Sequence, residues 1–454
     1  MEQIPQLIKE IGTIIWGWPM IILLLGTHLF LTIKLRFPQR KIFTAIKISL
    51  QKDENSKGDV SQFAALATAL AATIGTGNII GVATAIALGG PGAVFWCWLT
   101  GVLGIATKYS EGLLAIKYRV TNSNGEMSGG PMYALENGLK CKWLAVLFCI
   151  FTAVAALGIG NMVQSNSIAK LVETTWSIDG YITGIVITIL VALVIIFGIK
   201  GIAKVCSTFV PLMALFYIVG CVWLLCINIE YVPEALMMIV KEAFSLEAVE
   251  GGTVGTIMIV AMRYGIARGL FSNESGLGSA PILAAAAQTR NPVRQALVSA
   301  SGTFWDTVII CALTGVVLVS SMIAYPDIDS SLGGTLTSAA FSKIPIVGST
   351  MLTISLFTFA FSTILGWCYY GEKAVEYLSG VRYIKVYRIV WIVVAFIGTI
   401  VELEVVWDIS DVMNALMALP NIISLLLLSG VLAKETRYYL WGNHLNDYEP
   451  PYKK

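Results

Sequence analysis

The chain has 454 residues, of which 56% are hydrophobic and only 13% are charged, and its formal net charge is +2. This composition excludes an ordinary soluble globular protein and is typical of a helical membrane protein that crosses the bilayer several times. The small net charge and the lack of a basic run predict no nucleic-acid partner. Eight cysteines form no Cys-x-x-Cys pair and only two histidines occur, so we expect neither a zinc site nor a disulfide framework.

Eleven apolar segments are long enough to cross the hydrocarbon layer of about 30 Å, which takes about 20 residues of helix. They cover residues 12–33, 62–88, 93–116, 143–169, 181–199, 205–228, 254–287, 294–324, 346–371, 386–404 and 409–432. The residues ahead of the first segment are not basic, so we interpret it as a span and not as a signal peptide. The predicted fold class is an all-α integral membrane protein with eleven transmembrane helices.

The positive charges predict the orientation of these helices, because basic loops stay in the cytoplasm. Of the 30 Lys and Arg residues, 24 lie in the loops and the tail on one side of the predicted spans, and four lie on the other side. The N-terminus is therefore predicted outside and the C-terminus in the cytoplasm, in a multi-pass protein of the cell membrane. The remaining two, Arg263 and Arg268, fall within the seventh segment, where a charge is costly and suggests a function.

Residues 72–81, in the middle of the second segment, hold three glycines, two hydroxyls and an amide. These favour an opened helix, which is tolerated at membrane depth only where it is buried in protein or lines a cavity. Opened backbone N–H groups there suit a carboxylate, and the carbonyls near Ala72 and Gly75 suit a cation. The N–H groups in question belong to Gly75, Thr76, Gly77 and Asn78. The alternative is a helix-packing face of small residues.

A second polar stretch, residues 268–281, interrupts the seventh segment. If it were an extramembrane loop, residues 255–267 would be too short to cross alone, so a discontinuous helix fits better. The two broken segments are five apart and therefore cross in opposite directions. This arrangement predicts an inverted repeat of five plus five helices, with a site at the membrane midplane where the broken helices meet.

The predicted organisation follows from this repeat. Residues 1–61 hold an extra N-terminal helix and a basic cytoplasmic loop, 62–228 the first repeat, 229–253 an extracellular connector, 254–432 the second repeat and 433–454 a cytoplasmic tail.

Five sequence blocks resemble the alanine or glycine:cation symporter family. They are residues 89–98, 124–133, 158–164, 268–281 and 363–373, with Cys97 where the family usually has Met. The resemblance implies the amino acid–polyamine–organocation superfamily fold, shared with the leucine transporter, with ten core helices and one extra. It also implies a secondary symporter that imports a small neutral amino acid, alanine or glycine, with sodium. We expect no other cofactor and no obligate protein partner.

The hydroxyls of Ser362 and Thr363 on the ninth segment could supply two sodium ligands, next to oxygens of Ala72 and Gly75. In the leucine-transporter fold the corresponding helix contributes such a pair to a sodium site, so the resemblance agrees with the chemistry. The alternative for each hydroxyl is a bond back to the carbonyl one turn earlier.

The resemblance also implies substrate contacts. Gln164 could reach the ammonium or carboxylate of the amino acid, with contact between helices as the alternative. Phe271 and Trp367 would form apolar walls around a small side chain. The predicted substrate site comprises Gly75, Thr76, Gly77, Asn78, Gln164, Phe271, Asn273, Thr363 and Trp367.

Three charged residues, Arg268, Glu274 and Asp306, are expected to form an ion-paired gate or strut and not to bind ligands. Proton coupling is an alternative to sodium, but no titratable residue lies beside Ser362 and Thr363. Another small zwitterion is an alternative substrate. A channel is disfavoured because the polar residues cluster at two breaks, and an enzyme because histidines and metal-ligand spacings are scarce.

Overall fold

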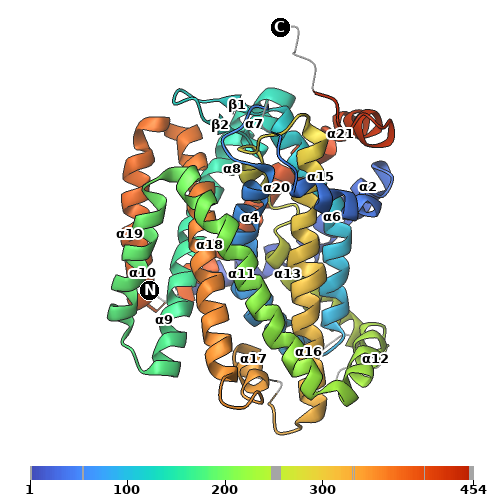
Figure 1. Cartoon of the computed structure of the whole chain (residues 1–454), viewed down its shortest axis with the longest axis vertical. Coiled ribbons are helices and arrows are strands. Elements are labelled where there is room, and N and C mark those ends of the chain that lie inside the picture. The colour runs from blue at the N-terminus through green and yellow to red at the C-terminus, as the bar shows by residue number, and fades with distance from the viewer. Residues whose placement is uncertain are drawn as a thin grey trace.

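The computed structural model describes residues 3–53, 56–246, 257–329, 331, 333–402 and 404–448. Residues 247–253 of the predicted connector, the start of the predicted seventh span at 254–256 and the tail from 449 lie outside this part. The described chain is helical apart from turns and one short hairpin, β1 (Val120–Thr121) paired with β2 (Met127–Ser128). Figure 1 shows an elongated bundle with the hairpin near one end and α12 (Val232–Ala243) and α17 (Gly333–Phe341) at the other.

Six described helices are long and apolar enough to cross a membrane, or up to eight if each of two bent helix pairs counts as one span. This confirms a multi-pass all-α membrane protein, whereas the number eleven remains a prediction. Helices also occupy the other predicted segments, but α10 (Gly180–Ile195) has 16 residues and α13 (Ile257–Asn273) has 17. The third of these segments contains α6 (Ala93–Lys117), which carries two buried charged residues, Lys108 and Glu111.

The first predicted span is interrupted between α1 (Gln3–Ile15) and α2 (Trp18–Lys34). Pro19 lies in the first turn of α2, where its missing N–H has no helical role. The predicted basic loop after α2 contains helix η1 (Pro38–Lys41) and α3 (Ile42–Ser49), bent by 67° from α2.

The core helices pair across the two predicted repeats, with α6 packed on both α13 and α15, and α10 on α19.

The first repeat contains α4 (Gln62–Thr73), η2 (Gly77–Gly81), α5 (Val82–Gly89), α6, α7 (Pro131–Tyr133), η3 (Ala134–Gly138), α8 (Lys142–Ala155), η4 (Ala156–Met162), α9 (Val163–Trp176), α10 and α11 (Gly198–Ile227). The connector holds η5 (Ile229–Tyr231) and α12. The second repeat contains α13, α14 (Ala280–Ala284), α15 (Pro292–Thr303), η6 (Phe304–Cys311), α16 (Ala312–Ala324), α17, α18 (Gly348–Ser379), η7 (Val381–Tyr383), α19 (Ile384–Ile400) and α20 (Glu404–Leu427), followed by α21 (Ser429–Glu435) and η8 (Thr436–Trp441).

Both predicted helix breaks are present. Helix α4 ends because Ile74 adopts an extended backbone, and the chain resumes as a helix at Gly77 after a bend of 53°. Helix α13 ends at Asn273, and Gly276 and Gly278 then take φ values of +93° and +88°. Because L residues with a side chain rarely adopt these angles, the glycines allow the chain to turn before α14 begins.

Candidate substrate and ion site

A cavity of about 20 Å³ lies where the two broken helices meet α9, α18 and α20. Eight of the eleven predicted site residues line it, namely Ala72, Gly75, Thr76, Gly77, Gln164, Phe271, Thr363 and Trp367. We call it the central cavity. Its volume suits about one water molecule or an ion of similar size, so an amino acid would have to displace the surrounding side chains.

The contact between Gly75 and Thr363 brings the first break against α18. A Cβ atom on Gly75 would lie 2.7 Å from Thr363 Oγ1, so only glycine allows this approach. Thr363 Oγ1 donates to the Phe359 carbonyl at 3.0 Å, and Ser362 Oγ donates to the Ala71 carbonyl at 3.2 Å. The predicted alternative, bonding back along the helix, thus occurs for both hydroxyls, since Ser362 Oγ also donates to the Phe359 carbonyl at 2.9 Å. A hydroxyl that donates in this way still has lone pairs that can face a cation.

Gln164 connects the first break to the π-helical turn η4. Its Nε2 donates to Thr76 Oγ1 at 3.4 Å and to the Ile159 carbonyl at 3.1 Å. Its Oε1 is buried and has no hydrogen-bond partner. Buried polar atoms nearly always have a partner, so this oxygen is available to an ammonium or a cation in the cavity.

Two aromatic side chains form apolar parts of the cavity wall. A Cβ atom on Gly77 would lie 3.5 Å from the Phe271 ring, an ordinary contact distance. Trp367 is buried, and a side chain on Gly160 of η4 would collide with it. Its ring centroid lies 5.3 Å from that of Tyr370, so the indole is held on two sides.

Three predicted site residues lie outside the cavity wall. Asn78 closes the break, because its Oδ1 accepts from the Gly75 N–H at 2.8 Å while its Nδ2 donates to Asp306 Oδ1 at 2.7 Å. Asn273 Oδ1 accepts from the Ser275 N–H at 2.9 Å. Ser362 is fully buried beside Ala71. The sequence pattern indicates polar groups at the breaks, but these side chains bind the opened backbone or a neighbouring helix.

The expected gate of Arg268, Glu274 and Asp306 does not form, since no ion pair joins them within the described chain. Arg268 lies in a separate vestibule of about 510 Å³ with Asp411. Asp306 accepts hydrogen bonds from Asn78 and Ser272, one residue from each break. Glu274 lines the central cavity, which sequence reasoning missed although its position between Asn273 and Ser275 could have suggested it.

Three cavities follow one another through the protein. Phe271 lines both the vestibule and the central cavity. Thr73 lines both the central cavity and an inner cavity of about 20 Å³, which also includes Lys108 and Asn273. Phe271 and Thr73 therefore lie where neighbouring cavities adjoin.

Hydrogen bonds join segments 57–60 and 285–288 and Arg119 into an arrangement that we call the backbone clasp. The Asp59 N–H donates to the Ala286 carbonyl at 2.8 Å, and Gln288 N–H to the Val60 carbonyl at 2.8 Å. Arg119 donates to carbonyls of both segments at 2.8–3.0 Å. Because the segments flank the two broken helices, the clasp holds both repeats together at this end.

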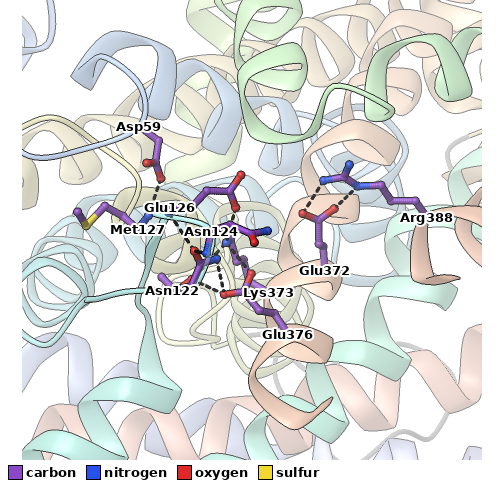
Figure 2. A network of polar contacts seen from close by, with 10 residues as sticks. Asp59, Asn122, Asn124, Glu126, Met127, Glu372, Lys373, Glu376 and Arg388 are labelled. Atoms are coloured by element: carbon purple, nitrogen blue, oxygen red, sulfur yellow. Dashed lines mark hydrogen bonds and ion pairs between the residues drawn. The ribbon is translucent and has the colours of Figure 1, made fainter. Parts of the chain in front are cut away.

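The β1–β2 hairpin docks beside the clasp on α18, as Figure 2 shows. Lys373 donates to Glu376 at 2.7 Å and to Glu126 at 3.3 Å, while Glu376 accepts from Ser128 Oγ at 2.6 Å. Asp59 of the clasp accepts from the Met127 N–H at 2.8 Å. Helix α18 thus carries both Thr363 and this hairpin contact.

Two charged residues labelled in Figure 2, Arg388 and Asp59, contribute to the electrostatics of this end. Arg388 pairs with both carboxylate oxygens of Glu372, at 2.7 and 2.8 Å, which fixes α19 against α18. Burial raises the pKa of the Asp59 carboxyl above its ordinary value, and the hydrogen bond from Met127 opposes this shift.

Comparison with known proteins gives a consistent result. The chain matches the sequence model of the sodium:alanine symporter family over residues 1–453. A sodium/alanine symporter, AgcS, from Methanococcus maripaludis is 51% identical over 442 residues, which cover 96% of this chain and 97% of the relative. An uncharacterized transporter from Haemophilus influenzae is 49% identical, with 98% of each chain covered.

Among solved structures, the crystal structure of MhsT in complex with L-phenylalanine is similar, with a TM-score of 0.59. It is 13% identical in sequence, and the alignment covers 85% of this chain and 95% of MhsT. At this identity the likeness concerns the fold alone. It agrees with the leucine-transporter fold that the sequence predicts.

Proposed function

Because this chain belongs to the sodium:alanine symporter family, we propose that it is a secondary active symporter that imports alanine or glycine together with sodium. The observation that carries the proposal is the central cavity, where both broken helices meet Gln164 and Thr363. Inward movement of one positive charge releases about 2.3 kcal/mol per 100 mV, which can concentrate a neutral zwitterion.

The proposed sodium site lies between the end of α4 and α18. The last carbonyls of a helix have no helical partner, so the Ala72 carbonyl is available as an oxygen ligand. Thr363 contributes a hydroxyl, supported by Ser362 through its bond to Ala71. These are hard oxygen donors, the type that an alkali cation prefers.

The proposed substrate site occupies the other side of the same cavity. The N–H groups of Thr76 and Gly77, at the start of the helix that resumes after the break, suit the amino-acid carboxylate. Trp367 and Phe271 form apolar walls of this cavity, and two bulky rings there favour a substrate with a small side chain, such as alanine or glycine.

The proposed transport cycle alternates access to this cavity. The predicted topology, with eleven spans and the N-terminus outside, assigns the vestibule to the extracellular side and the clasp to the cytoplasmic side. In the described conformation Phe271 borders both the cavity and the vestibule, and the clasp joins the two repeats at the opposite end. Import then requires Phe271 to move first and the clasp to open second.

Proton coupling is a second candidate, because Glu274 places a carboxylate in the cavity that contains Thr363. Uptake of labelled alanine into proteoliposomes tests both candidates. We expect an inward sodium gradient to drive accumulation, and potassium or a pH gradient alone to fail. Accumulation driven by the pH gradient without sodium would replace the proposal with proton symport.

A further inference from the structure

Glu274 is the one charged side chain that lines the central cavity within the described residues. It is 3% exposed, and its Oε2 accepts a hydrogen bond from Ser279 Oγ at 2.5 Å. No positively charged group of the described chain forms an ion pair with it. A buried carboxylate without an ion-pair partner is costly, so its position at a cavity wall points to a positively charged ligand.

The surrounding charges leave this carboxylate uncompensated. Lys108 is the positive side chain that acts electrostatically on Glu274, and it acts on Glu111 and Asp306 as well. Glu111 already accepts from the N–H groups of Gly276 and Gly278, at 3.0 and 3.1 Å, and from Asn421 at 2.7 Å. One ammonium cannot compensate three carboxylates, and Glu274 is the one of the three that lines the central cavity.

The backbone at Glu274 is also unusual. Its φ of +54° places it in the left-handed region, which residues other than glycine rarely occupy. Such conformations persist where the surroundings impose them, and they cluster at ligand sites. Glu274 adopts this conformation directly after the end of α13, and its carboxylate lies at the cavity wall.

We propose that Glu274 receives the ammonium group of the transported amino acid, while the N–H groups after the first break receive its carboxylate. This inference rests on the proposed function and deepens it, because it assigns the group that recognises the α-amino end. The two broken helices then bind opposite ends of one zwitterion. The site consequently rejects small carboxylates that lack an ammonium, such as lactate and propionate.

Calorimetric titration of the purified protein at saturating sodium tests this assignment, with L-alanine and propionate as the ligands. The wild-type protein should bind alanine at least tenfold more tightly than propionate. The Glu274→Gln variant keeps the shape of the side chain and removes its charge, so its affinity for alanine should fall about 10- to 100-fold. Its affinity for propionate should stay within about twofold of the wild-type value.

Asp306→Asn is the matched control, because Asp306 is equally buried but lies outside the cavity wall. It should preserve the ratio of alanine to propionate affinity. Glu274→Asp keeps the charge and withdraws it by one methylene, so it should lose less alanine affinity than Glu274→Gln.

Several results would overturn the assignment. The first is a Glu274→Gln variant that binds alanine as tightly as the wild-type protein does. The second is a Glu274→Gln variant that loses affinity for alanine and for propionate equally. The third is a variant whose sodium half-saturation rises while its alanine affinity at saturating sodium is unchanged. If the variants fail to fold, equal binding of alanine and propionate by the wild-type protein would refute it. A wild-type protein that binds no alanine in sodium would instead refute the proposed function.

Discussion

Substitution of Gly75 by alanine tests the proposed ion site through a single methyl group. The added Cβ would lie 2.7 Å from Thr363 Oγ1, and ordinary contacts begin at 3.4 Å, so one of the two atoms must move by about 0.7 Å. Gly75 does not have a positive φ, so the backbone itself accepts alanine. The expected effect is therefore a displaced ion ligand in a protein that still folds.

The expected magnitude follows from this displacement. A shift approaching 1 Å in a site that depends on geometry can cost up to about 100-fold, so we expect the sodium half-saturation of alanine uptake to rise at least tenfold, or about 1.4 kcal/mol. Gly81→Ala is the matched control, since no atom lies within 4 Å of its added Cβ. Its sodium titration should stay within about twofold of the wild-type curve. A Gly75→Ala protein whose sodium titration overlays the wild-type curve would refute a sodium site at this contact.

Four other substitutions give further tests. Thr363→Ala should raise the sodium half-saturation about tenfold while thermal unfolding stays near that of the wild type, because one hydroxyl ligand is lost; an unchanged titration would remove this ligand from the site. Gly77→Leu should abolish alanine uptake by filling the cavity, and normal uptake would argue against the opened helix. Trp367→Ala should weaken alanine binding and allow valine or leucine to compete with alanine. If the variant still prefers only the smallest side chains, another residue must select substrates by size. Lys373→Met should leave buried carboxylates uncompensated, at a cost of about 3–5 kcal/mol in stability. Protease should then cut the β1–β2 hairpin faster in this variant than in Lys385→Met, the control at an exposed site. Equal rates of cleavage in the two variants would show that Lys373 does not hold the hairpin.

The helix breaks could be predicted from the sequence because their cause is local. Three glycines in residues 72–81 and two more at Gly276 and Gly278 weaken a helix wherever they occur in the fold. A break inside an apolar segment also has few permitted surroundings, since lipid cannot satisfy the opened backbone. Composition and spacing therefore located the two breaks and the cavity between them, whereas Gln164, Phe271 and Trp367 of its wall were predicted from the family resemblance.

The directions of individual side chains could not be predicted in the same way. Asn78 satisfies the N–H of Gly75 and also binds Asp306, 228 residues away, and only the packing of η6 beside the first break creates that choice. Glu274 reaches the cavity wall through a left-handed backbone conformation that no periodic pattern reveals. Arg268 lies six residues before Glu274 but lines the vestibule and not the central cavity, so nearness in sequence did not produce an ion pair.

The clasp and the hairpin contact were missed for a related reason. The clasp consists mostly of backbone hydrogen bonds between segments 57–60 and 285–288, which carry no side-chain signature. Lys373 and Glu376 lie at a helix end that would ordinarily be solvated, and they are buried because the hairpin covers them. Their partners follow from tertiary packing alone.

The central claim is that alanine and sodium cross the membrane together through one cavity, and reciprocal coupling tests it most directly. Proteoliposomes would be prepared with equal sodium and equal pH on both sides, and an inward alanine gradient would then be applied with the membrane potential held at zero. The account predicts that radioactive sodium accumulates inside, and that Gly75→Ala reduces this accumulation while Gly81→Ala does not. Entry of alanine without any net movement of sodium would contradict the account.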